Sequence, residues 1–144
     1  MEDLFGQQVA VFRGQPTERI VFTEEDEETV IEEVFYGGML IEQFDSDLQK
    51  VRRLSSSGST VINQARRDAW SGLMWCYDLW EHPAAMTFDA ACAFCGADSE
   101  RIRNAVSIEF ADEIRLMFSV VSARLPEQAQ RIQSRLSHYV TLNH

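Results

Sequence analysis

The sequence predicts a mostly α-helical fold: a compact bundle of five or six helices that contains a helix-turn-helix-like segment, with a short β-hairpin at the N-terminus. Across most of the 144 residues, apolar side chains recur every three or four positions, which is the spacing of one helix face. Residues that commonly cap helices, such as Thr23 and Asp98, stand just before two of these stretches. Strand-like runs of Val, Ile and Phe are expected only before residue 23.

The N-terminal elements expected are the hairpin and two helices. Residues 8–13 and 19–22 flank a Gly-Gln-Pro turn and predict the hairpin. Thr23 caps a helix that extends to Tyr36, where Gly37-Gly38 ends it. Four apolar residues are expected on the inner face of this helix: Val30, Ile31, Val34 and Phe35. A second helix is expected over residues 39–54, with its own inner face at Leu40, Phe44, Leu48 and Val51.

The remaining helices follow a serine-rich loop at residues 55–59. One long helix is expected over residues 60–80, with a wide apolar stripe that runs from Ile62 to Trp80. Residues 87–106 predict two short helices, residues 108–125 predict another, and Pro126 begins a last helix that ends near Val140. We divide the chain into an acidic N-terminal subdomain, residues 1–56, and a helical subdomain, residues 57–144.

Residues 87–106 have the layout of a helix-turn-helix. Gly96 stands where the chain must leave the first helix, a position that favours positive φ. Asp98 or Ser99 can cap the second helix. Small residues that allow close helix approach are expected on the inner face of the first helix, at Ala91, Cys92 and Cys95.

The second helix of this segment carries the candidate nucleic-acid contacts. Ile102 and Ala105 are expected to point into the angle between the two helices, and the polar residues between them to point away. Arg and Asn are the side chains that recognise guanine and adenine edges or hold phosphates. With a second arginine pair earlier in the chain, the predicted nucleic-acid-binding residues are Arg66, Arg67, Arg101, Arg103 and Asn104. The alternative is a helical hairpin within an ordinary all-α core.

The net charge of −10 is confined to the first third of the chain. Residues 1–50 hold 13 acidic and 3 basic residues, whereas residues 51–144 hold 10 of each. A neutral, arginine-bearing second part can approach a phosphate backbone while the acidic part faces elsewhere. The alternative is that these arginines pair with the local acids.

The N-terminal acids predict a docking surface for a basic protein partner, with a solvated helix face as the alternative. Its candidate residues are Glu24, Glu27, Glu28, Glu32 and Glu33. Because no run of about 18 apolar residues occurs, no membrane span is expected. A signal peptide begins with basic residues, whereas this chain begins with acidic ones. The sequence therefore predicts a cytoplasmic location, which would be the host cytoplasm if a phage encodes the chain. The oligomeric state is left open.

Catalytic and cofactor sites have little support in the sequence. It contains no P-loop, G-x-G-x-x-G, G-x-S-x-G or H-E-x-x-H motif, so we expect neither an enzyme nor a cofactor. The Cys-x-x-Cys of residues 92–95 falls in a helix at inward positions, where cysteine serves as a small buried residue. A zinc site is therefore only a weak alternative, and its four ligands would be Cys76, His82, Cys92 and Cys95.

Residues 66–103 resemble a module found in small phage-encoded and bacterial regulatory proteins. The positions that carry the resemblance are Arg67, Ala69, Trp70, Phe88, Cys92, Gly96, Asp98, Ile102 and Arg103. The resemblance implies a helix-turn-helix-like fold in a mobile-element setting, where related modules serve as repressors, antiterminators and inhibitors of host machines.

Two functional hypotheses follow. In the first, a phage-type transcription regulator binds DNA through the helix-turn-helix and docks on a host protein complex through its acidic part. In the second, an acidic anti-defence or anti-CRISPR type inhibitor blocks a host machine, and the helix-turn-helix is only scaffold. Pairing of Arg101 and Arg103 with acids of the fold would favour the second hypothesis.

Overall fold

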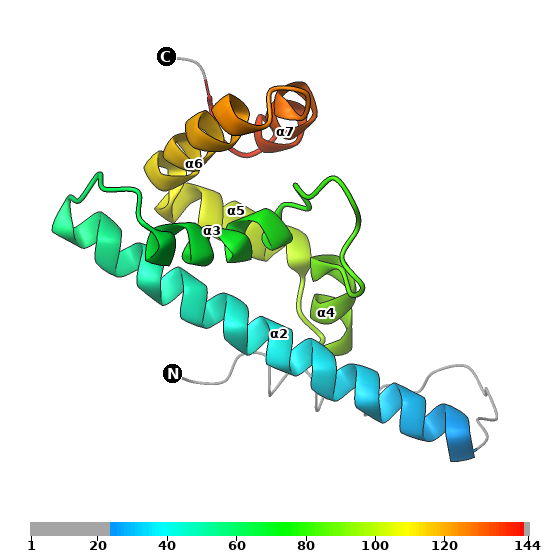
Figure 1. Ribbon diagram of the computed structural model, residues 1–144. Coiled ribbons are helices and arrows are strands. Elements are labelled where there is room, and N and C mark those ends of the chain that lie inside the picture. The colour runs from blue at the N-terminus through cyan, green and yellow to red at the C-terminus, as the bar shows by residue number, and fades with distance from the viewer. Residues whose placement is uncertain (1–23, 143–144) are drawn as a thin grey trace.

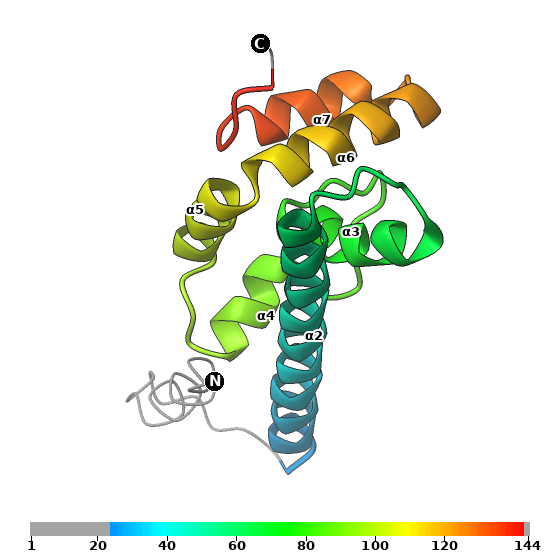
Figure 2. The same cartoon turned by 90° about the vertical axis from the view of Figure 1, so that its left-hand side faces the viewer.

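The computed structural model describes residues 24–142, with side chains described from residue 28. Every regular element in this range is a helix, which confirms the mostly α-helical fold; the predicted hairpin lies outside the described residues. The helices are α2 (Glu24–Ser57), α3 (Gln64–Cys76), α4 (Phe88–Phe94), α5 (Ser99–Glu109), α6 (Ala111–Arg124) and α7 (Ala129–Leu136). In Figures 1 and 2, α3 and α4 pack across α2, while α6 and α7 lie side by side at the top of both views.

The long helix α2 is continuous for 34 residues, so the predicted break at Gly37-Gly38 is wrong. Gly37 is buried where α4 crosses. A side chain added there would begin 3.4 Å from the Met86 sulfur and 3.5 Å from both the Ala91 Cα and the Phe94 Cβ. A Cβ at residue 37 would make ordinary van der Waals contacts, so the close packing does not depend on glycine, and it keeps the helix intact despite the weak helix propensity of glycine.

Helix α3 is shorter than predicted, ending at Cys76 instead of near residue 80. Asp78 adopts a φ of 54°, which turns the chain out of the helix. The turn is held by the Tyr77 hydroxyl, which donates a hydrogen bond to the Arg103 carbonyl at 2.7 Å, and by the buried side chain of Leu79. Trp80 is consequently exposed and does not extend the apolar stripe of α3.

The connection between α4 and α5 follows the prediction closely. Gly96 has a φ of 69°, and the Asp98 side chain caps α5 by accepting hydrogen bonds from the Glu100 and Arg101 amides. Cys92 and Cys95 are fully buried. The C-terminal helices differ in their bounds, because α5 continues to Glu109 and α7 spans only Ala129–Leu136.

Three aromatic rings contact one another where α2, α3 and α4 meet. The ring centroids of Phe44 and Trp75 are 6.1 Å apart, and the Phe88 centroid lies 5.2 Å from each of them. All three pairs are edge-on, an arrangement that aromatic quadrupoles favour. The rings therefore hold the three helices to one another.

The α2–α3 contact depends on Gly72, which yields a first testable prediction. A Cβ at residue 72 would lie 2.8 Å from Oδ2 and 2.9 Å from Cβ of Asp47. Gly72→Ala should therefore lower the free energy of unfolding by about 1–3 kcal/mol, measured by urea denaturation followed by tryptophan fluorescence. The matched control is Gly38→Ala, whose Cβ meets nothing within 4 Å. The control should raise stability by up to about 1 kcal/mol, and an equal gain for both variants would contradict the prediction.

Candidate functional site

Arg66, a predicted nucleic-acid contact, is buried and fully engaged within the fold. Its guanidinium pairs with both carboxylate oxygens of Glu113, at 2.6 and 2.8 Å, and donates to the carbonyls of Ser59 and Val61. The Trp70 indole N–H donates to Glu113 at 2.7 Å. With only 2% of its surface exposed, Arg66 joins α3 to α6 in the interior of the fold.

Arg103 was expected to point outward, and this expectation is wrong. The side chain is 8% exposed, and its Nε donates to the Cys76 carbonyl at the end of α3, 2.7 Å away. Its Nη1 pairs with Asp89 at 2.9 Å and with Glu100 at 3.4 Å, and its guanidinium lies 5.2 Å from the centre of the Phe88 ring. Position 103 shares a helix face with Val106, so it turns toward the core.

The other predicted nucleic-acid contacts are divided between surface and interior. Arg101 and Asn104 are exposed, as expected for the outer side of α5, whereas Arg67 is half-buried. Ile102 is half-buried against the core, but Ala105 is exposed and does not face inward as expected. The exposed acids Asp98 and Glu100 stand close to Arg101 in the sequence. Their charges oppose the attraction of Arg101 for a phosphate.

The alternative zinc ligands are not brought together. Among the side chains described, those of residues 28–142, no three of Cys, His, Asp or Glu are grouped as a metal site requires. Cys76, Cys92 and Cys95 are buried, while His82 is exposed in the segment that follows α3. Burial raises the pKa of the Cys76 thiol and raises that of Cys92 to about 12. Both cysteines therefore serve as small apolar core residues.

The N-terminal half of α2 carries an exposed apolar surface where a buried face was predicted. Phe35 is 71% exposed, and Ile31 and Met39, four residues before and after it, are also exposed. These three side chains, which we call the outer stripe, lie one above another, on the side opposite Gly37 and Phe44. The predicted inner face is therefore wrong for Val30, Ile31 and Phe35, whereas Val34 is half-buried. The reason is that α4 packs on the side of α2 that carries Gly37.

Acidic side chains accompany the outer stripe. Glu28 and Glu32 are exposed near the stripe, as predicted, and Glu42 continues the acidic character along the helix. Glu33 is also exposed, but it lies on the Gly37 side of α2. The side chains of Glu24 and Glu27 lie outside the described part of the chain. The result is a helix surface with three apolar anchors set among carboxylates. Such a surface can bury apolar area against a partner while its charges select a basic one.

Two residues that no motif singled out are buried carboxylates, Asp47 on α2 and Glu113 on α6. Asp47 lies three residues after Phe44 and four before Val51, so its spacing already placed it on the inner face. Glu113 has the same spacing, three residues after Phe110 and four before Met117, but its partner Arg66 is 47 residues away and no local pattern identifies it.

Comparisons with known proteins add no relationship to this description: no family model, curated protein or solved structure matches the chain. None of the helices described is both long and apolar enough to cross a bilayer.

Proposed function

We propose that the protein works by binding another protein, as an acidic inhibitor of a host machine, and that the outer stripe of α2 is its docking surface. The observation that carries the proposal is the exposure of Ile31, Phe35 and Met39 among carboxylates. The partner is a protein with an apolar groove bordered by Lys and Arg, such as a nucleic-acid-binding groove.

The physical argument is that of a helix laid into a groove. Such recognition uses anchors three or four residues apart on one helix face, and an aromatic anchor commonly supplies much of the binding energy. Phe35 stands at the centre of the outer stripe. The surrounding carboxylates would steer association with a basic partner and repel acidic ones.

The arginine contacts support this proposal over nucleic-acid binding. Arg103 pairs with Asp89 and Glu100, which is the arrangement that favours a scaffold role for the α4–α5 segment. The nucleic-acid hypothesis keeps Arg101 and Asn104 as its exposed candidates. The phage-type setting and the cytoplasmic location remain predictions that accompany either function.

A second testable prediction concerns Phe35. The full chain is immobilised and used to capture the partner from a nuclease-treated lysate of the source or host organism. The captured partner is then purified, and its binding is measured by calorimetric titration. Phe35→Ala should raise the Kd at least about tenfold, because the aromatic anchor loses its contacts in the pocket of the partner. Ile108→Ala is the matched control, since Ile108 is an 83% exposed apolar residue on α5. The control should bind like the unaltered chain.

Three results would reject the docking surface. Equal Kd values for Phe35→Ala and Ile108→Ala would do so directly. A dimer in light scattering that Phe35→Ala dissociates would assign the outer stripe to a second copy of the chain. A loss of more than about 1 kcal/mol of stability in Phe35→Ala would show that the chain itself covers the surface, since exposed apolar residues contribute little.

A further inference from the structure

Asp47 is a buried carboxylate without a cationic partner. It is 5% exposed, and its one hydrogen bond within the described chain comes from the Gln43 amide, which donates to Oδ1 at 3.1 Å. Carboxylates are rarely buried to this extent unless they are paired. None of the ion pairs among the described residues includes Asp47.

The other buried carboxylate shows what a structural site looks like in this protein. Glu113 receives two hydrogen bonds from Arg66 and one from Trp70. Asp47 has one neutral donor in place of three donors. Burial raises the pKa of the Asp47 carboxyl, and the Gln43 hydrogen bond and the more remote Lys50 only partly oppose this shift. The negative charge is therefore incompletely compensated within the fold.

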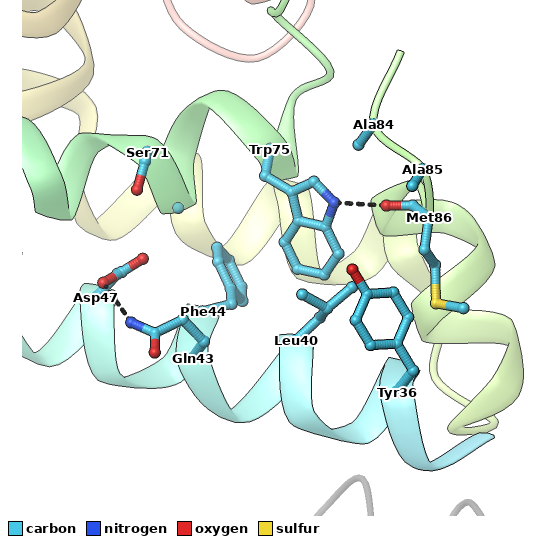
Figure 3. Close-up of a pocket in the computed structure, with 11 residues that line it drawn as sticks. Tyr36, Leu40, Gln43, Phe44, Asp47, Ser71, Trp75, Ala84, Ala85 and Met86 are labelled. Carbon is cyan, nitrogen blue, oxygen red and sulfur yellow. Dashed lines mark hydrogen bonds between the residues drawn. The ribbon is translucent and has the colours of Figure 1, made fainter. Parts of the chain in front are cut away.

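The carboxylate lines a cavity of about 200 Å³ between α2, α3 and the segment before α4. Figure 3 shows Asp47 and Gln43 at one end, and Tyr36 and Met86 at the other, with Phe44, Leu40 and Trp75 between them. The Trp75 indole N–H donates to the Met86 carbonyl at 2.9 Å, which fixes this wall. No lysine, arginine or histidine is among the residues that line the cavity.

Together these features favour a ligand with a positively charged group at the end of a narrow alkyl chain. The carboxylate can accept hydrogen bonds from an ammonium group, while the Phe44 and Trp75 rings contact methylene groups and attract positive charge. Sites for drug-sized ligands usually measure roughly 300–1,000 Å³, so this cavity fits something smaller. Anions are disfavoured by Asp47.

We propose that the cavity lined by Asp47, Phe44 and Trp75 binds a primary alkylammonium group, carried either by a free amine or by a lysine side chain of another protein. The ammonium pairs with the Asp47 carboxylate, and the alkyl chain lies along the aromatic wall toward Tyr36. The site and the outer stripe share no residue, so the proposal does not depend on the docking role of the stripe.

The test is an NMR titration of the full, isotope-labelled chain with n-butylammonium, with n-butanol as the neutral comparator. Saturable shifts are expected at the Gly72 amide and the Trp75 indole. Asp47→Asn should weaken binding at least tenfold. Asp45→Asn, which makes the same charge change on α2 outside the cavity lining, should leave binding unaltered.

A second variant guards against misfolding of Asp47→Asn. Ala85 is an exposed residue beside Met86, so Ala85→Trp should fill the end of the cavity where the alkyl chain lies without disturbing the core. It should also weaken binding at least tenfold. The proposal is overturned if no saturable shift occurs, if n-butanol binds as tightly as n-butylammonium, or if the folded Asp47→Asn and Ala85→Trp variants bind unchanged.

Two further ligands distinguish the source of the ammonium group. Tighter binding of 1,5-diaminopentane than of a blocked Gly-Lys-Gly peptide assigns the cavity to free amines. Tighter binding of the peptide assigns it to a lysine side chain of a partner.

Discussion

Glu113→Ala should lower the free energy of unfolding by about 3–5 kcal/mol, the largest effect that we expect from a single charged residue. The substitution leaves the Arg66 guanidinium buried with one of its sides unpaired, and it removes the acceptor of the Trp70 indole N–H. Burying an uncompensated charge is far more costly than losing an exposed pair. Urea denaturation followed by circular dichroism measures the loss.

The matched control is Glu109→Ala, which breaks a second two-pronged arginine pair. Arg52 contacts both oxygens of Glu109 at 2.6 and 3.0 Å, but both side chains are exposed. This variant should lose no more than about 1 kcal/mol. Similar losses for Glu109→Ala and Glu113→Ala would contradict the importance of burial. Replacing Arg66 and Glu113 together with leucine should cost less than the sum of the single losses, because neither charge is then left alone.

Arg103→Ala should lower the free energy of unfolding by about 3 kcal/mol, because the buried guanidinium makes charge-assisted hydrogen bonds and packs on a ring. The Cys76 carbonyl loses its donor, Asp89 loses its ion-pair partner, and the Phe88 ring loses its cationic cover. The control is Arg101→Ala, two residues earlier on the exposed side of α5, which should change stability by less than about 0.5 kcal/mol.

The same pair of variants separates the two functional hypotheses. In the protein-docking proposal, Arg103→Ala is a stability variant and Arg101→Ala is silent. The opposite result is an Arg103→Ala protein that keeps its stability but no longer binds a nucleic acid. That result would support the nucleic-acid contact predicted for Arg103 from the sequence.

Acidification provides an independent check on the Arg103 contacts. The hydrogen bond from Arg103 lowers the pKa of Asp89 below its ordinary value of 3.8. The pair therefore stabilises the fold above about pH 4, and this contribution is lost as pH falls through the lowered pKa of the native state. Arg103→Ala should remove that part of the acid sensitivity, seen as a flatter dependence of melting temperature on pH below 4.

The sequence by itself determined the features that depend on neighbours along the chain. Helical spacing of apolar residues located the helices, and Gly96 and Asp98 marked the turn and the cap between α4 and α5. Cys92 and Cys95 were placed correctly in the interior. These outcomes follow from backbone conformation and local hydrogen bonding, which a few adjacent residues decide.

Tertiary structure alone decided which surfaces are covered. The apolar residues of α2 form more than one stripe, and the packing of α3 and α4 selected the side with Phe44 and left Phe35 in solvent. The same packing kept α2 continuous through Gly37.

Burial of the charged residues was likewise decided by distant segments. Arg66 meets Glu113 across 47 residues, and Arg103 meets the Cys76 carbonyl across 27. A long side chain can face water or a remote acceptor with equal local propensity. The choice is made by the free energy of contacts that exist only after the helices have assembled.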